Sequence, residues 1–336
     1  MKRLALVLMA VPASWFVLLG GWTHDTTAAD KKLKVALVLQ GGGLPDPFQG
    51  IVYAGFQRAV KELGVEGKAL SAGVKEGTRP TLAYFARQRY DLVIGVGFLD
   101  IYNVDAVARR FPGTRFALMD GAWEAMPHRP RNALGTVYKV EEGAYLAGYL
   151  AALMERRRPG KDVISSVGGV KIPTVDSFIA GYQAGARRAN PRIVTLNGYS
   201  QDFLDRARCR RVAQSQVARG SGVVFQVAGG CGRGALDVAR RNGLWGIGVD
   251  SDQSSLGPHI LTSVLKRLDV ATYLTIKALT EGKLRTGRSA VFTLRNGGVS
   301  LGKTSPEVPR RFVARLERIK REIISGKIGK VPATVP

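Results

Sequence analysis

The residue types on which enzymes most often rely are scarce in this chain of 336 residues. Its three histidines are His24, His128 and His259, and its two cysteines are Cys209 and Cys231. The sequence contains no H-E-x-x-H zinc motif and no paired C-x-x-C. We therefore expect a protein that is not an enzyme and that holds no metal and no cofactor.

Two groups of residues leave an enzymatic alternative open. Cys231 stands in the segment Gly229-Gly230-Cys231-Gly232 before a predicted helix, where a thiol has a lowered pKa. The carboxylates of Asp250 and Asp252 are a second reactive group. The alternative class is an exported enzyme that uses Cys231 or these carboxylates, although no histidine partner for Cys231 is evident.

Polar and glycine-rich segments follow the ends of several predicted strands. They are Gln40-Gly41-Gly42-Gly43, Gly95-Val96-Gly97-Phe98, Asp120-Gly121, Gly168-Gly169, Ala228-Gly229-Gly230 and Asp250-Ser251-Asp252. In parallel sheets a ligand lies beyond the carboxyl ends of the strands, so these segments predict the place of a binding cleft. The first glycine cluster lacks dinucleotide-fingerprint spacing and a Walker lysine, and therefore predicts a flexible turn.

Alternating strands and helices must position these segments. The predicted strands are Leu33–Gln40, Lys68–Val74, Asp91–Gly97, Arg115–Asp120, Ala133–Lys139, Asp162–Gly169, Ile193–Tyr199, Val223–Gly230, Trp245–Asp250 and Ile260–Lys266. Amphipathic stretches between them predict helices, and a further helix is predicted over Pro306–Ile324. This alternation predicts an α/β protein with two doubly wound parallel-sheet lobes of about five strands each, joined near Lys139 and again near residues 260–265.

The N-terminus has the features of an export signal. Lys2 and Arg3 precede an apolar run from Leu4 to Trp22, and Thr27-Ala28-Ala29 supplies small residues before Asp30. We predict a signal peptide and a periplasmic or other extracytoplasmic location. A retained membrane anchor is the alternative, because the apolar run nearly reaches the length needed to span a bilayer. No cysteine lies in this segment, so we expect no lipidated N-terminus.

The formal net charge of +24 could indicate a polyanion as partner. The basic residues are, however, scattered over many predicted helices, as Arg109-Arg110, Arg156-Arg157-Arg158, Arg187-Arg188, Arg210-Arg211 and Arg240-Arg241 show. Such groups are typical of solvated helix faces. We therefore expect no nucleic acid among the partners.

Four ordered segments resemble the basic membrane protein family, whose best-known members are purine-nucleoside receptor lipoproteins. The segments are Val137–Gly148, Val167-Gly168-Gly169 with Pro173 and Phe178, Val224–Gly230, and Gly248-Val249-Asp250-Ser251-Asp252-Gln253. The resemblance runs from about Leu33 to Leu301. It implies a type I periplasmic-binding-protein fold, in which three crossovers hinge two α/β lobes around an enclosed ligand.

The resemblance also implies a domain organisation and a role. The expected parts are a signal peptide over residues 1–29, an N-terminal lobe over 32–138 plus 264–292, and a C-terminal lobe over 139–263 plus 293–330. The implied role is that of a monomeric solute-binding protein that delivers a nucleoside, with purine as the favoured base, to an ABC permease in the membrane. A sensor that reports to a receptor, or a binding protein for another small polar solute, is the alternative.

Ligand-binding positions follow from the same resemblance. Phe48 and Phe203 match the two rings that sandwich the base, and Lys266 matches a lysine that reaches the sugar. Stacking of a base on an aromatic ring contributes about 1–3 kcal/mol. Asp250 could accept hydrogen bonds from vicinal ribose hydroxyls. The expected set is completed by Asp120 for the base edge, Gly230 in the third motif, and Asp46.

One segment departs from the family. Where relatives carry an acidic residue followed by Ser-Phe-Asn, this chain has Pro45-Asp46-Pro47-Phe48-Gln49. Asp46 could replace the usual acid, or the position could be lost. Because a site that hydrogen-bonds a group discriminates against analogues lacking it, this segment leaves the exact nucleoside open.

The two cysteines are expected at one edge of the second lobe. Cys209 lies in the first turns of the predicted helix that follows the strand ending at Tyr199, and Cys231 follows the strand ending at Gly230. In βαβ geometry both positions fall near Phe203. We predict a Cys209–Cys231 disulfide that fixes one wall of the cleft, with free thiols as the alternative.

Overall fold

The computed structural model describes residues 32–335 apart from 42–43, 45–46, 74–75 and 161. The predicted signal peptide over residues 1–29 and the candidate residue Asp46 therefore lie outside the described residues. In the part of the chain that is described, no helix has the length and apolar character needed to cross a membrane.

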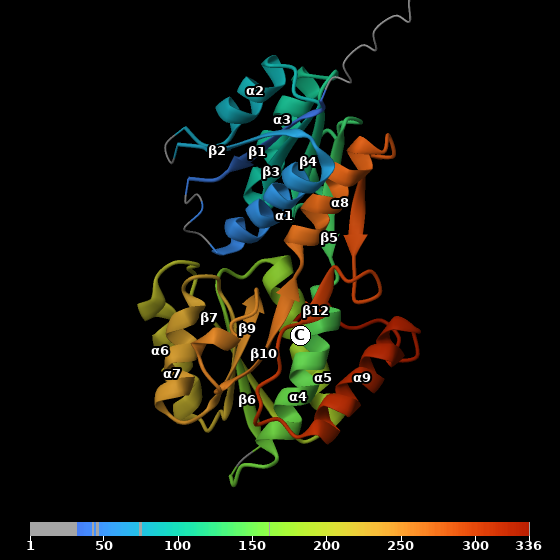
Figure 1. The fold of residues 1–336 in the computed structure, drawn as a ribbon. Helices are drawn as coiled ribbons and strands as arrows, with labels where there is room; N and C mark the ends of the chain where they lie inside the picture. Colours follow the sequence, from blue (N-terminus) through green and yellow to red (C-terminus); the bar gives the residue numbers. More distant parts are fainter. Residues whose placement is uncertain (1–31, 42–43, 45–46, 74–75, 161, 336) are drawn as a thin grey trace, which may run out of the picture. The chain divides into compact units, whose positions relative to one another are not determined.

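The first sheet has six strands in the order β11-β5-β4-β3-β1-β2, and all its neighbours run parallel (Figure 1). The strands are β1 (Lys34–Leu39), β2 (Glu66–Ser71), β3 (Leu92–Val96), β4 (Arg115–Met119), β5 (Ala133–Tyr138) and β11 (Arg288–Phe292). Its helices are α1 (Pro47–Leu63), α2 (Arg79–Arg87), α3 (Ile101–Arg110) and α8 (Leu268–Thr280), with short 3-10 turns at Phe98–Asp100 and Trp123–Ala125.

Alternate side chains of β1 enter two separate cores. Val35, Leu37 and Leu39 pack with α1 and α8 on one face of the sheet. Ala36 and Val38 pack with α2 and α3 on the other face. Helices cover both faces, so the central strands are apolar at nearly every position, as is usual for parallel sheets.

The second sheet also has six strands, in the order β12-β10-β9-β8-β6-β7. They are β6 (Val163–Gly168), β7 (Val194–Tyr199), β8 (Val223–Val227), β9 (Trp245–Asp250), β10 (Ile260–Lys266) and β12 (Val299–Leu301), which is antiparallel to β10. The helices α4 (Val140–Glu155), α5 (Pro173–Ala189) and α9 (Arg310–Ile324) cover one face, and α6 (Arg206–Ala218) and α7 (Gly232–Arg241) cover the other (Figure 1). A 3-10 turn spans Ser254–Leu256.

The chain passes between the two sheets at three places, after β5, after β10 and after β11. The crossing segments are joined by backbone hydrogen bonds. Lys139 N–H donates to Phe292 O over 2.8 Å, and Arg267 N–H donates to Gly298 O over 3.0 Å. Glu142 adds a side-chain link, since its Oε2 accepts from Leu294 N–H at 2.8 Å. The three crossings therefore lie side by side.

The predicted fold class is confirmed, since the chain forms two α/β lobes built on parallel sheets. Two strands were not predicted. β11 is an edge strand whose exposed and buried positions are mixed, and β12 has only three residues, so neither has the apolar run that identifies the other strands. The predicted lobe boundaries stay a prediction.

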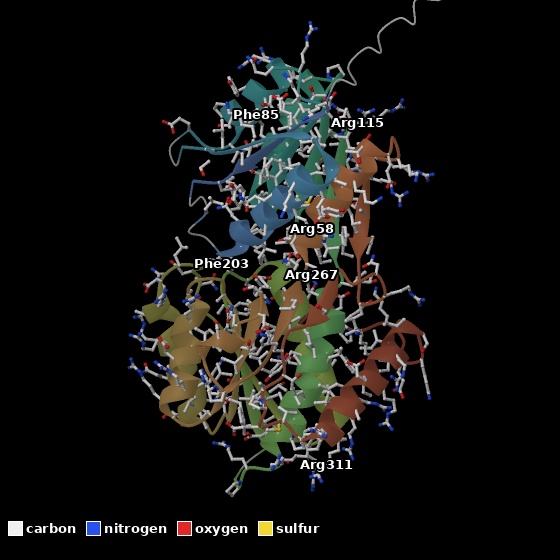
Figure 2. The ribbon with its side chains drawn as sticks, viewed as in Figure 1. Arg58, Phe85, Arg115, Phe203, Arg267 and Arg311 are labelled. Atoms are coloured by element: carbon white, nitrogen blue, oxygen red, sulfur yellow. A yellow bond between two sulfur atoms is a disulfide. The ribbon has the colours of Figure 1, made fainter. Side chains whose placement is uncertain are left out.

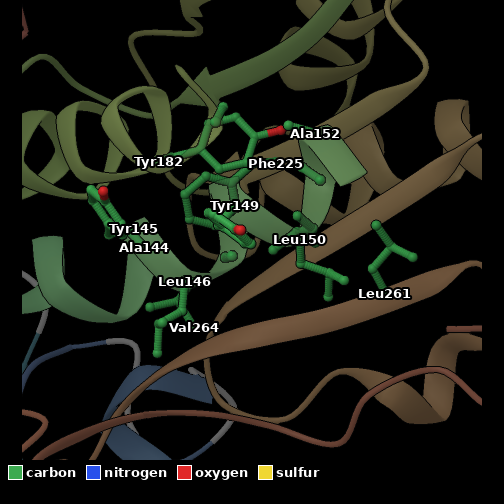
Figure 3. Packing of buried hydrophobic residues seen from close by; sticks show 14 of the residues in the cluster. Ala144, Tyr145, Leu146, Tyr149, Leu150, Ala152, Tyr182, Phe225, Leu261 and Val264 are labelled. Carbon is green, nitrogen blue, oxygen red and sulfur yellow. The ribbon is translucent and has the colours of Figure 1, made fainter. Parts of the chain in front are cut away.

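Helices α4 and α5 pack unusually closely because glycines face backbone across their interface. A Cβ at Gly148 would lie 1.8 Å from the carbonyl oxygen of Tyr182, and one at Gly185 would lie 1.9 Å from that of Tyr145. Figure 3 shows Tyr182 and Phe225 beside Tyr149 and Leu150 in the core beneath this contact. The short interhelical distance lets these large rings fill the space above the sheet.

Replacing Gly148 by alanine tests this contact. We expect Gly148→Ala to lower the free energy of unfolding by about 2 kcal/mol or more, because the added methyl group must push two backbones apart. Urea unfolding followed by circular dichroism measures the change. The matched control is Gly113→Ala, where a Cβ meets no atom within 4 Å, and it should lose no stability. Equal stability of the two variants would contradict the close-packing account.

Candidate ligand-binding site

Lys266, the last residue of β10, is the best-defined charged group at the candidate site. Its side chain is 3% exposed, and Nζ donates to both carboxylate oxygens of Asp120, at 3.0 and 2.9 Å. The same ammonium lies 5.7, 5.7 and 5.6 Å from the ring centroids of Phe48, Tyr138 and Phe178, respectively. An ion pair and three aromatic faces thus hold one buried cation.

Asp120 follows β4 in the first sheet, whereas Lys266 ends a strand of the second sheet, so the ion pair joins the two lobes. The backbone of Asp120 is left-handed, with φ of 64°. Its N–H donates to Thr136 Oγ1 at 2.9 Å, and that hydroxyl donates to Leu118 O at 3.2 Å. These bonds turn the chain sharply at the strand end and direct the carboxylate toward Lys266.

Tyr138, at the end of β5, contributes a neutral ring to the same group. Burial of its hydroxyl raises the pKa of Tyr138 well above the ordinary value, and the nearby charge of Asp120 acts in the same direction. The phenol therefore remains protonated at physiological pH. A neutral ring beside the Lys266–Asp120 pair leaves the pair's charge balance unchanged.

Asp250 occupies in the second sheet the position that Asp120 has in the first. Each follows or ends the fourth strand of its lobe, and the φ angle of Asp250 is 65°. The segment after Asp250 is held by Gln253, whose N–H donates to Ser263 Oγ at 3.0 Å and whose side chain donates to Val249 O at 3.2 Å. These bonds hold the turn at the carboxyl end of β9, where Asp250 is half-buried.

Phe48 lies in the first turn of α1, beside the end of β3. A Cβ at Gly97 would be 3.7 Å from the Phe48 ring and 3.4 Å from Gln40 Nε2. Gln40 is in turn fixed by two bonds, since its side chain donates to Val96 O at 2.8 Å and its N–H donates to Gln49 Oε1 at 2.6 Å. The Phe48 ring thus lies beside Gly97, where the φ of 85° favours glycine.

Phe203 lies in the loop between β7 and α6, at the end of the second lobe (Figure 2). The ring packs on Gly169, where a Cβ would be 2.4 Å from it. The carbonyl oxygen of Phe203 accepts from Cys231 N–H at 2.9 Å. Cys231 forms a disulfide with Cys209, with Cα atoms 5.6 Å apart. Gly230, also in the expected set, precedes Cys231 and would place a Cβ 3.5 Å from Phe203 O.

The structure brings Asp120 and Phe48 together around Lys266, and it places Asp250, Phe203 and Gly230 at the carboxyl edge of the second sheet. Among the residues that the structure describes, no cluster of histidine, cysteine or acidic side chains could hold a metal ion. The two surface grooves described, of about 340 and 260 Å³, lie beside α1 and β2 and beside the end of α9. Neither groove is lined by an expected ligand residue. The candidate site is therefore defined by the contacts between its side chains and not by a groove.

Several residues that contact the candidate-site residues were not identified from the sequence. Tyr138 and Phe178 belong to the motif segments that carry the family resemblance, which was the available signal for them. Gln226 and Gln253 also lie in those segments, and a 3.2 Å hydrogen bond joins their side chains. Gln40 directly follows the first strand, and this position was the only feature of the sequence that could have identified it.

The combination of two parallel-sheet lobes, three adjacent crossovers and polar groups at the strand ends defines a two-lobed solute-binding protein. Residues 32–334 match the family described as ABC transporter substrate-binding protein PnrA-like. The chain belongs to this family. Its members are described as ABC transporter substrate-binding proteins, and the predicted class is consistent with that description.

Individual relatives agree with this assignment. The chain is 28% identical to a Lactococcus lactis protein named ABC transporter nucleoside-binding protein BmpA, over 97% of this chain and 98% of the relative. It is 32% identical to an uncharacterized lipoprotein of Pyrococcus abyssi, over 83% and 71% of the two chains. A solved solute-binding protein of an Aeropyrum pernix ABC transporter system superposes with a TM-score of 0.75 at 25% identity, covering 88% of this chain and 92% of that one.

The Lys266–Asp120 pair can be tested by its effect on stability. Asp120→Asn retains the shape and tolerates the left-handed backbone, but it leaves a buried ammonium without a counter-charge. We expect a loss of about 3 kcal/mol in the free energy of unfolding. The double variant Asp120→Asn with Lys266→Met removes both charges and should recover at least half of that loss in urea unfolding. A double variant that is less stable than Asp120→Asn alone would show that the pair is not the relevant interaction.

Proposed function

We propose that this protein captures a nucleoside, with purine as the favoured base, between its two lobes and presents it to an ABC permease without changing it chemically. The observation that carries the proposal is the joint contact of Lys266 with Asp120 and with Phe48, Tyr138 and Phe178. It gathers a hydrogen-bond donor, a carboxylate acceptor and flat apolar faces from both lobes. A ligand with one flat ring and several hydroxyls matches this combination.

Stacking is proposed for Phe48 and Phe203. Both rings are half-buried and lie beside a glycine at a strand end, Phe48 near Gly97 and Phe203 packed on Gly169. A half-buried ring that already packs against its neighbours has little freedom left to lose when a base stacks on it. Preorganisation of this kind raises affinity because the ordering cost is met before binding.

The ribose is assigned to Asp250 and Lys266. A carboxylate can accept two hydrogen bonds from vicinal hydroxyls, and an ammonium can donate to a hydroxyl or ring oxygen. Asp120 is assigned to the base edge, Gly230 supplies backbone close to the ligand, and Asp46 is proposed as the acid that replaces the usual family residue. Because Asp120 already neutralises Lys266, the site provides no excess positive charge for a phosphate.

The role in transport rests on the family and on the named relative. The Lactococcus lactis relative carries the name nucleoside-binding protein, and the family is one of ABC transporter substrate-binding proteins. We propose that ligand binding closes the lobes about the three crossovers, so that the closed form is the one recognised by the permease. We further propose that the protein acts as a monomer and that nucleic acid is not among its partners.

Calorimetric titration against a ligand panel tests the proposed function. The panel contains adenosine, guanosine, inosine, uridine, 2′-deoxyadenosine, adenine, ribose, glucose and a mixture of amino acids. We expect micromolar or tighter binding of at least one purine nucleoside, and at least tenfold weaker binding of its 2′-deoxy form because Asp250 loses a donor. Tight binding of a sugar or an amino acid, with no nucleoside bound below millimolar concentration, would exclude the proposal. Chromatography of the recovered ligand checks that it is unchanged.

A change at Phe203 tests the stacking contact. Loss of the ring removes about 1–3 kcal/mol of stacking, so Phe203→Ala should weaken binding of the preferred nucleoside by about 5- to 150-fold. Phe203→Trp should retain it. The neighbouring Leu204 is 81% exposed and provides a matched control, since Leu204→Ala should leave the affinity unchanged. Equal affinities of the wild type and Phe203→Ala would remove Phe203 from the site.

A further inference from the structure

The loop that carries Phe203 is held at several points along its backbone. Ser200 N–H donates to Gly168 O at 2.9 Å, and Gln201, with φ of 57°, donates from N–H to Gly169 O at 3.1 Å. Asp202 Oδ1 accepts from the N–H groups of Leu204 and Asp205 at 2.6 and 2.8 Å. The loop therefore has one defined path between β7 and α6.

Cys231 contacts both halves of this loop. Its backbone N–H donates to Phe203 O at 2.9 Å, and its Sγ lies 3.4 Å from Ser200 Oγ. The residue directly precedes α7, which begins at Gly232, so the loop is fixed against the first turn of that helix. The position of the Phe203 backbone thus depends on where Cys231 lies.

The disulfide completes a closed path that links the Phe203 loop, α6 and the start of α7. From Phe203 the chain runs into α6 and reaches Cys209, the disulfide leads to Cys231, and the Cys231 N–H returns to Phe203 O. Both cysteines are 0% exposed and lie in a small core with Val167, Val224 and Ala235. No other covalent link within the described residues joins α6 to the start of α7.

We propose that the Cys209–Cys231 disulfide positions Phe203 for the ligand, so that the protein acquires its full affinity only after oxidation outside the cytoplasm. This inference rests on the proposed stacking role of Phe203. The two cysteines are positioning residues, because they act on the ligand through the loop. Without the bond, α6 and the start of α7 are joined by the small core and by the close approach of Gly234 to the Arg206 backbone, and the Phe203 loop gains alternative positions.

The proposal gives oxidation a functional consequence. Two thiols become one disulfide by thiol–disulfide exchange, and two electrons and two protons pass to a disulfide oxidant. The bond forms in an oxidising compartment and not in the reducing cytoplasm. Because both sulfur atoms are buried, reductants cannot reach the bond in the folded protein. A precursor still in the cytoplasm would bind ligand weakly, whereas the exported protein would keep its affinity permanently.

The first experiment is a double-mutant cycle on ligand affinity. The full chain is compared with the variant carrying Cys209→Ala and Cys231→Ala, each with and without Phe203→Ala, by calorimetric titration with the purine nucleoside that the wild type binds best. We expect the cysteine pair to weaken binding at least tenfold. In the cysteine-free background, Phe203→Ala should then weaken binding by less than threefold, because the ring is already displaced. Additive effects, or an unchanged affinity of the cysteine-free protein, would overturn the proposal.

A matched control separates positioning from loss of stability. Val238 lies in the same small core and is 4% exposed, so Val238→Ala removes packing there without touching the loop. It should lower the unfolding midpoint in urea yet leave the nucleoside affinity within twofold of the wild type. Should the cysteine-free variant fail to fold, wild-type protein refolded with dithiothreitol is compared with protein refolded with oxidised glutathione, and the same tenfold difference is expected.

A readout without ligand distinguishes this inference from the proposed function. Hydrogen exchange followed by mass spectrometry should show at least tenfold faster exchange of residues 200–205 in the cysteine-free protein, with α4 and α5 unchanged. If the wild type binds no nucleoside but the loop exchanges faster, the nucleoside proposal fails and the positioning role stands. Unchanged exchange of the loop would refute the positioning role whatever the wild type binds.

Discussion

The candidate site depends on one buried charge, the ammonium of Lys266. Removing an ammonium from water costs several kcal/mol unless a partner compensates, and here the compensation comes from Asp120 and three aromatic faces. Asp120 belongs to the first lobe and Lys266 to the second. The need to neutralise Lys266 therefore couples the candidate site to the contact between the two lobes. A ligand that enters this site must replace these contacts or add to them.

The two lobes share the same strand order and similar residues at their strand ends. Their five main strands have the equivalent orders β5-β4-β3-β1-β2 and β10-β9-β8-β6-β7, and a left-handed aspartate stands at the end of the fourth strand in each. An aromatic ring also lies beside a strand-end glycine in both lobes, Phe48 near Gly97 and Phe203 against Gly169. The sequence shows no internal repeat, so the correspondence lies in the backbone and in a few residue types at the strand ends.

The layout of the fold could be predicted from the sequence because helices cover both faces of each sheet. Strands such as β3, which is buried along its full length, leave an unbroken apolar run. β11 and β12 could not be found in this way, because each is defined by pairing with a strand distant in the sequence. The prediction also extended several strands by one to three residues into their terminal turns, as at Val223–Gly230, since residue type alone does not distinguish a last paired residue from a first turn residue.

For the site, the sequence and the family resemblance identified individual residues and not their contacts. Asp120 and Lys266 were both expected near a ligand, but 146 residues separate them, and no local pattern specifies a pair between two sheets. Tyr138 and Phe178 were not assigned for a related reason, because an aromatic residue acquires its role from the cation that its ring faces. Asp46 lies outside the described residues, so its place in the site stays a proposal.

The left-handed backbone at Asp120 and Asp250 restricts how such a site can change its specificity. At φ of 64° and 65°, most side chains would strain the chain, whereas glycine, asparagine and aspartate are accommodated readily. The backbone alone therefore favours aspartate, asparagine or glycine at each position, and at Asp120 either replacement would also leave Lys266 without its counter-charge. Divergence toward other ligands is thus directed to the aromatic and loop positions around these two fixed points.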